Sequence, residues 1–142
     1  MPARRDWQDA AVLRGKALFQ QTGCEACHHA RLVTAVDAEL PELSSQTIRP
    51  YSDLLLHDMG SGLADGRPEF DAGGREWRTP PLWGLGLEKT VSHEISLLHD
   101  GRARSAEEAI PWHGGEAEPS REAFKKLAKA RRAELLRFLD SL

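Results

Sequence analysis

Two cysteines and a histidine lie within five residues, and they constrain the fold more than any other feature of the sequence. Cys24 and Cys27 have the C-x-x-C spacing, and His28 follows immediately. This spacing places two thiols about one turn apart, where both can bond to the vinyl groups of one haem while the histidine binds the iron. We therefore predict one covalently bound haem c with His28 as the proximal ligand, and a fold that packs around it.

Two other sites could use the same pair of cysteines. A redox-active C-x-x-C of the thioredoxin type follows a strand and opens a helix within a βαβ unit, and no such pattern surrounds Cys24. A zinc site could combine Cys24 and Cys27 with two of the six histidines. Structural zinc commonly draws on a second paired motif, which this sequence lacks. The residues favour the haem.

The size and charge of the chain narrow the remaining possibilities. Its 142 residues suffice for one compact domain, and 40% hydrophobic with 29% charged residues is typical of a soluble globular protein. The net charge of −3 does not favour a nucleic-acid partner. No stretch reaches the about 20 apolar residues that cross a bilayer, so we expect no membrane span.

The predicted haem also bears on localisation. Covalent haem attachment normally takes place outside the cytoplasm, so we expect a periplasmic or otherwise exported protein. Residues 1–7 contain no apolar run of the kind found in a signal peptide. We therefore expect that an export signal was removed, or that this chain is a domain of a longer exported protein.

Hydrophobic periodicity predicts an all-α, loop-rich fold with no convincing strand. We assign residues 1–8 to an N-terminal extension and residues 9–142 to a single cytochrome c-like domain whose helices pack around the haem. The expected helices cover residues 9–21, a short turn at 52–58, residues 105 to 112 or 113, and a final stretch from about 120 to the C-terminus.

Two further features support a cytochrome-like domain. The first helix contains Gly15, and residues 15–19 resemble the N-terminal helix of class I cytochromes c, where glycine permits close crossing by the C-terminal helix. The segment from 60 to 86 is rich in glycine and proline, yet large apolar residues occur in and just after it. We expect these to pack against a flat apolar group such as a haem face; they are Trp77, Leu82, Trp83, Leu85 and Leu87.

The second axial ligand has several candidates in the sequence. Met59 would give histidine–methionine ligation with a raised reduction potential, and His113 would give ligation by two histidines. His93 and His99 are further possibilities. The chemistry of the residues alone leaves Met59 and His113 level.

Three segments, residues 50–60, 77–85 and 99–117, resemble the C-terminal cytochrome c domain of the di-haem oxidoreductase family, whose members are also described as thiol oxidoreductases. That family is related to bacterial di-haem cytochrome c peroxidases and to the di-haem enzyme that matures methylamine dehydrogenase. The similarity extends from Gly15 to Leu142 and so covers nearly the whole chain.

The resemblance implies a particular ligand set. In the wider superfamily an Arg-x-Pro-x-Leu motif and a His-x-Gly motif precede a short helix, which ends in the distal ligand just before a glycine. Here the motifs begin at Arg78 and His99, and the residue before the glycine is His113. The resemblance therefore implies ligation by His28 and His113, with Met59 as the alternative distal ligand.

The resemblance also bears on function. Family members carry two haem motifs, whereas this chain has one. It is therefore similar to the electron-relaying half of such an enzyme, with a low-spin haem and either a redox partner protein or a second haem domain as its partner. The alternative is a peroxidase-like or thiol-oxidising enzyme whose distal ligand can leave, in which His57, Asp58 and Glu116 could act as acid–base groups.

Four other residues are candidates for contacts with the haem. Arg78 and Arg102 could pair with the haem propionates, because guanidinium–carboxylate pairing is bidentate and strong. Trp83 and Trp112 could pack on the macrocycle, although packing in an ordinary core would explain them equally well. We assign no catalytic residue from the sequence.

Overall fold

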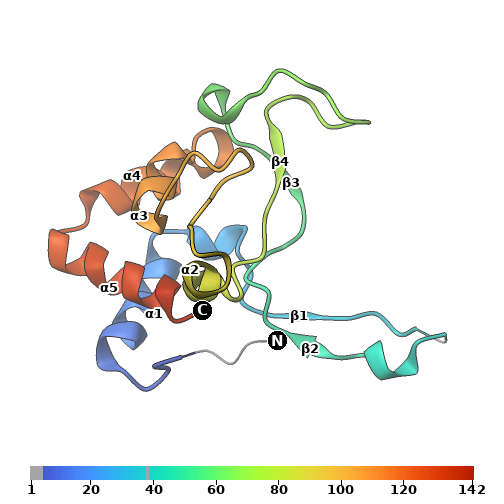
Figure 1. The fold of residues 1–142 in the computed structure, drawn as a ribbon, viewed down its shortest axis with the longest axis horizontal. Coiled ribbons are helices and arrows are strands. Elements are labelled where there is room, and N and C mark those ends of the chain that lie inside the picture. The colour runs from blue at the N-terminus through green and yellow to red at the C-terminus, as the bar shows by residue number, and fades with distance from the viewer. Residues whose placement is uncertain (1–4, 38) are drawn as a thin grey trace.

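The computed structural model describes residues 5–37 and 39–142, and its helices gather on one side while two hairpin segments project from the other (Figure 1). The first four residues of the expected N-terminal extension lie outside the described residues. The elements in chain order are α1 (Ala10–Gln21), β1 (Leu32–Val33), β2 (Thr47–Ile48), β3 (Leu56–Asp58), β4 (Glu76–Arg78), α2 (Glu88–Ser92), α3 (Ala106–Ala109), α4 (Glu118–Lys126) and α5 (Lys129–Asp140).

The predicted crossing of the first and last helices is present. Asp9 caps α1 by accepting hydrogen bonds from the Ala11 and Val12 N–H groups, and Gly23 in the left-handed region follows its end. Gly15 lies directly on the backbone of α5. A Cβ there would overlap the Glu134 carbonyl oxygen and lie 2.8 Å from the Cβ of Phe138. The crossing is buried in a core formed by Val12, Leu18, Phe19, Tyr51, Phe124, Leu135, Phe138, Leu139 and Leu142.

We expect Gly15→Ala to lower the free energy of unfolding by roughly 1–3 kcal/mol, because a methyl group at this crossing must push two helix backbones apart. Gly62→Ala is the matched control, since a Cβ there would meet only the Trp112 ring at 3.8 Å. Urea unfolding followed by circular dichroism measures both variants. Equal stability of the two would contradict the close crossing.

The prediction of an all-α fold is wrong, because the chain also forms two small antiparallel sheets. β1 pairs with β2, and β3 pairs with β4 so that His57 lies opposite Trp77. The short helical turn expected at 52–58 is absent: residues 52–55 are irregular, with Leu54 at φ 64°, and lead into β3. Ser52 stabilises the non-helical conformation of this segment. Its buried hydroxyl donates to the Thr79 carbonyl oxygen over 2.7 Å and accepts the Leu54 N–H over 2.9 Å.

Two of the expected helices differ in extent from the prediction. α3 begins at the Ser105 cap, whose hydroxyl accepts the Glu108 N–H, but a 3₁₀ turn replaces the α-helix over Ile110–Trp112, where Pro111 lies. The final helical stretch is two helices, α4 and α5, because Leu127 adopts an extended conformation between them. His113 therefore follows a one-turn α-helix and a 3₁₀ turn rather than the single helix expected from 105 to 112 or 113.

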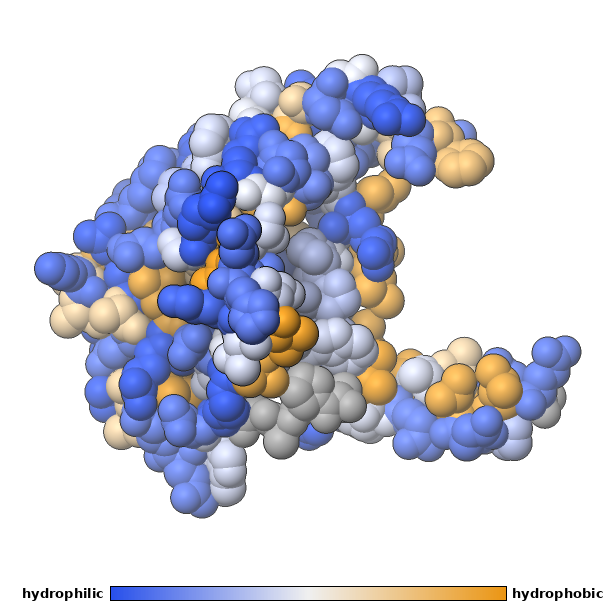
Figure 2. All heavy atoms as spheres, in the orientation of Figure 1, coloured by the Kyte–Doolittle hydropathy of each residue, from blue (hydrophilic) through white to orange (hydrophobic). Residues whose placement is uncertain are grey.

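Apolar residues on the projecting hairpins are left uncovered. Figure 2 shows hydrophobic residues along the wall of the recess between the two projections. The large exposed hydrophobic residues of these segments are Val33, Val36, Leu40, Leu43, Leu54, Leu55, Leu56 and Phe70. None of the described helices is both long and apolar enough to cross a membrane.

Candidate functional site

The cysteines and most of the candidate ligands meet in one cleft of about 760 Å³. This volume falls within the range of roughly 300–1,000 Å³ that is usual for ligand and cofactor pockets. Residues from many parts of the chain line the cleft, and those that matter below are Cys24, Cys27, His28, His57, Met59, Trp77, Arg78, Leu82, Trp83, Leu85, Leu87, His99, His113, Glu116 and Arg121. The five large apolar residues expected to face a flat group are all among them.

The two cysteines lie on a tight turn at one wall of the cleft. A 3₁₀ turn over Cys24–Ala26 follows Gly23, and the His28 N–H closes it by donating to the Cys24 carbonyl oxygen over 3.0 Å. Both cysteines are free. Burial raises the pKa of the Cys24 thiol, while burial and the charges of Asp53 and Glu116 raise that of Cys27. Raised thiol pKa values are the opposite of what a redox-active C-x-x-C pair requires.

His28 and His113 have the same kind of hydrogen bond and the same direction of pKa shift. The Nδ1 of His28 lies 2.9 Å from the Tyr51 carbonyl oxygen, and that of His113 lies 3.1 Å from the Ala109 carbonyl oxygen. A carbonyl can only accept, so each Nδ1 carries the proton and each Nε2 keeps a free lone pair. Burial lowers the pKa of His28 to about 4 and also lowers that of His113. Both rings are therefore neutral, which is the ligand form.

The other candidate distal ligands differ in position. Met59 and His99 line the cleft, but the His99 ring stacks on Trp77 with 3.5 Å between ring centroids. His93 ends α2 in a left-handed conformation and contributes to a separate small cavity of about 200 Å³. The geometry thus keeps His113 and Met59 as the strongest candidates and places His93 outside the cleft.

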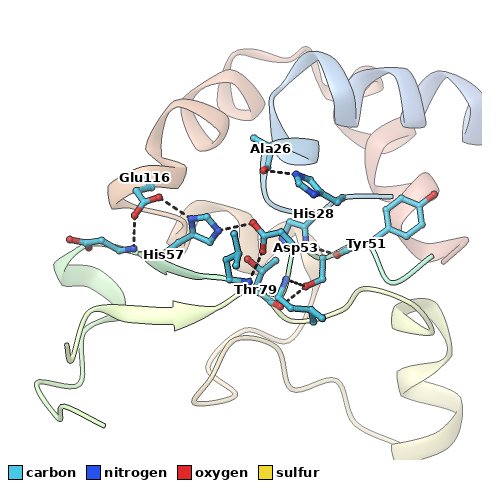
Figure 3. Close-up of polar contacts among 12 residues, drawn as sticks. Ala26, His28, Tyr51, Asp53, His57, Thr79 and Glu116 are labelled. Atoms are coloured by element: carbon cyan, nitrogen blue, oxygen red, sulfur yellow. Dashed lines mark hydrogen bonds and ion pairs between the residues drawn. The ribbon is translucent and has the colours of Figure 1, made fainter. Parts of the chain in front are cut away.

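Asp53, His57 and Glu116 form a chain of charged contacts (Figure 3), in which His57 and Glu116 line the cleft. His57 lies between two carboxylates, with Nε2 2.8 Å from Asp53 Oδ2 and Nδ1 2.8 Å from Glu116 Oε2. Glu116, followed by Asp53, raises the pKa of His57 above its ordinary value. The His57 ring and the Asp58 N–H lower the pKa of Glu116. Burial would raise the pKa of Asp53, but the Leu55 N–H, the His57 ring and Thr79 together hold it below the usual value.

These shifts define the pH range in which the chain of charges stabilises the protein. His57, with its raised pKa, stabilises the folded protein fully at low pH, and this stabilisation is lost as the pH rises through the pKa of His57 in the folded protein. Glu116 and Asp53, with lowered pKa values, lose theirs as the pH falls through those values. The attraction between His57 and the two carboxylates is therefore strongest at pH values above the pKa values of Asp53 and Glu116 and below the pKa of His57, a range that includes mildly acidic pH.

One group of ligand atoms in the described chain could suggest a metal ion in place of haem. Single atoms of Cys27, Asp53 and His57 lie within 4.8 Å of one another. Both ring nitrogens of His57 are already engaged by carboxylates, the Cys27 thiol has a raised pKa, and structural zinc needs four ligands. The group does not have the donors of a structural zinc site.

The remaining predicted contacts divide into two sets. Arg78 and Trp83 line the cleft, with Arg78 exposed at its edge. Arg102 and Trp112 are not among the lining residues: the Arg102 guanidinium lies 4.5 Å from the centroid of the Trp112 ring and donates to the Gly62 carbonyl oxygen over 2.7 Å. The structure therefore brings these two together at a different place.

Two charged residues were not predicted from the sequence, namely Asp53, which contacts His57, and Arg121, which lines the cleft. Asp53 lies four residues before His57, and the irregular chain between them, with Leu54 at φ 64°, brings Asp53 Oδ2 within 2.8 Å of the His57 ring. Arg121 on α4 lines the cleft and pairs with Glu118 and Glu122 on its own helix. No sequence signal distinguishes Arg121 from the other charged residues of this helix.

The chemistry of the cleft fits a haem. Free thiols, neutral histidines with available Nε2 atoms and a largely hydrophobic wall are groups that can attach, ligate and enclose a covalent haem. The family model described as "Di-haem oxidoreductase, putative peroxidase" matches residues 1–142, the whole chain, and this confirms the family resemblance noted in the sequence. Searches of curated proteins and of solved structures gave no match.

Proposed function

Since the chain belongs to the di-haem oxidoreductase family, we propose that it is an electron-transfer domain with one covalently bound, low-spin haem c. Cys24 and Cys27 would hold the haem through thioether bonds, and His28 and His113 would bind the iron. The bound haem would supply one-electron chemistry at iron. With both axial positions taken by protein ligands, electron transfer is the chemistry that remains available.

The observation that carries this proposal is the matched preparation of His28 and His113. Both line one cleft, both are neutral, and each has its Nδ1 committed to a backbone carbonyl. Such second contacts fix the orientation of a histidine and increase its basicity as a ligand. The two rings come from segments 85 residues apart in sequence, and a shared cofactor explains why both are arranged in the same way.

Other residues of the cleft would orient the haem and exclude water. Leu82, Leu85 and Trp77 supply apolar surface for the macrocycle. Arg78, which lines the cleft and is exposed, would pair with a haem propionate. Arg102 and Trp112, expected to contact the haem, are more simply explained by their own cation–π contact.

The proposed partner is a second haem domain or another redox protein. The family is di-haem, whereas this chain has one C-x-x-C-H motif, so its haem would exchange electrons with a group held elsewhere. The uncovered apolar residues of the two hairpins are compatible with such a partner, since exposed apolar patches commonly mark interaction surfaces. We expect this exchange to take place in the periplasm or another exported location.

A second candidate function has an observation in its favour. His57 and Glu116, which could move protons, line the same cleft. A peroxidase-like or thiol-oxidising enzyme would use such groups, provided that the distal ligand leaves the iron. Against this, both nitrogens of His57 are held by carboxylates, so this ring is not free to approach a substrate.

Optical spectroscopy separates the two functions. We expect the protein, matured in a host that attaches haem, to give a low-spin spectrum in both oxidation states, with sharp α and β bands when reduced. Ligation by two histidines predicts no charge-transfer band near ~695 nm in the oxidised state. High-spin iron that binds cyanide or peroxide rapidly would contradict the electron-transfer proposal and support the enzyme.

A further inference from the structure

The segment that carries His113 lies backbone against backbone on the end of β3. A Cβ at Gly114 would lie 2.9 Å from the Met59 carbonyl oxygen, and one at Gly60 would lie 2.9 Å from the Gly115 nitrogen. Gly60 and Gly115 also have positive φ angles of 77° and 53°. Glycine is therefore needed at this junction, because a side chain would not fit and because two of the residues have positive φ angles. The junction fixes the position of the backbone next to His113.

Glu116, three residues after His113, connects this junction to β3. Its Oε2 pairs with the His57 ring, and its Oε1 accepts the Asp58 N–H over 2.9 Å. One carboxylate therefore holds both a side chain and the backbone of β3. Because His113 follows a one-turn helix and a 3₁₀ turn, the elements before it provide little rigidity of their own.

The other end of the charged chain reaches the proximal side. His57 pairs with Asp53, whose side chain is only 5% exposed and whose Oδ1 also accepts the Leu55 N–H. Asp53 lies two residues after Tyr51, whose carbonyl holds His28. The Ser52 N–H, between them, donates to the His29 carbonyl oxygen over 3.1 Å. A continuous set of contacts thus joins the partner of His28 to the segment of His113 (Figure 3).

We propose that His57 is a positioning residue, which, through Asp53 and Glu116, holds the His113 segment at a fixed distance from the His28 side and so keeps the distal ligand on the iron. This inference rests on the proposed ligation by His28 and His113. It assigns to His57 a role opposite to that of an acid–base group: the imidazole closes the peroxidase-like route by preventing the distal ligand from leaving.

The rate of carbon monoxide binding to the reduced holoprotein tests this role, because carbon monoxide can bind a six-coordinate haem only after the distal ligand leaves. We expect His57→Ala to increase this rate by about tenfold or more, since charged hydrogen bonds on both sides of the ring are lost. Glu116→Ala should show a similar increase. Glu116→Gln should show a smaller one, because its amide oxygen can still accept the Asp58 N–H.

Glu134→Gln is the matched control. Glu134 also joins two elements, through a 2.6 Å ion pair with Arg14, but at the crossing of α1 and α5. We expect its rate to equal that of the wild type. Amide hydrogen exchange over residues 113–117 gives a second readout that does not depend on haem chemistry, and it should accelerate in the His57 and Glu116 variants but not in Glu134→Gln.

The outcomes separate this inference from the proposed function. A wild-type protein that is already high-spin would contradict the ligation itself. A low-spin wild type with unchanged carbon monoxide rates in Glu116→Ala and Glu116→Gln would overturn the role of His57 alone. Because Glu116 is half-exposed, these two variants are expected to fold even if His57→Ala does not.

Discussion

Replacing both cysteines by alanine, Cys24→Ala with Cys27→Ala, is expected to remove all haem from the denatured polypeptide. The two thiols project from one 3₁₀ turn at the wall of the cleft and are free of any disulfide. If both form thioether bonds, the wild-type chain carries the mass of one haem under denaturing conditions, and the double variant carries none. Mass spectrometry of the unfolded protein measures the difference directly.

The neighbouring His29 offers a control for this experiment. His29 is close to the motif in sequence, but its Nε2 donates to the Ala26 carbonyl oxygen, and the residue does not line the cleft. His29→Ala should therefore keep the full mass of one haem. A wild-type chain of bare polypeptide mass, produced where haem attachment operates, would contradict the covalent site.

The parts of the fold that were predicted correctly depend on short-range signals. Asp9 caps the start of α1, Gly23 follows its end, and the Ser105 hydroxyl caps the start of α3. The sheets were missed because β3 and β4 have three residues each, too few for an alternating pattern to register. They form through pairing between segments about 20 residues apart, where Ser52 and Thr79 contribute a buried hydrogen bond that no local pattern indicates.

The same distinction applies to the site. Cys24, Cys27 and His28 could be proposed as one site because they are contiguous in the sequence, and the structure brings all three to one cleft. The pairing of His57 with Glu116 spans 59 residues and depends on β3 being a strand. The sequence could not indicate this pairing, because residues 52–58 were predicted incorrectly as a helical turn. Arg102 and Trp112 lie in motif segments that matched the family, yet sequence position alone could not show that they contact each other.

Replacing His113 is expected to change the spin state of most of the iron. In His113→Ala the distal position loses its imidazole, so the oxidised protein should become largely high-spin and bind cyanide faster than the wild type. Added imidazole should restore the low-spin spectrum by entering the vacated position. Met59→Leu, which keeps the volume of the side chain without the thioether sulfur, should leave the low-spin spectrum intact.

A reversed result would assign the distal position to Met59, which also lines the cleft. The structure gives a reason to expect otherwise. The ring of His113 is oriented by the Ala109 carbonyl oxygen, whereas the contacts of Met59 at the junction are made by its backbone: its N–H donates to the Arg75 carbonyl oxygen over 2.9 Å, and its own carbonyl oxygen faces Gly114. Those contacts fix the chain at Met59 but do not orient its sulfur.

The substitution His113→Met extends this argument to the reduction potential. A thioether favours reduced iron more than an imidazole does, so the variant should have a higher midpoint potential than the wild type and should gain the charge-transfer band near ~695 nm. Both changes follow only if residue 113 is bound to the iron. If Met59 were the ligand, the same substitution would leave the band and the potential where they were, because the sulfur already present would still occupy the position.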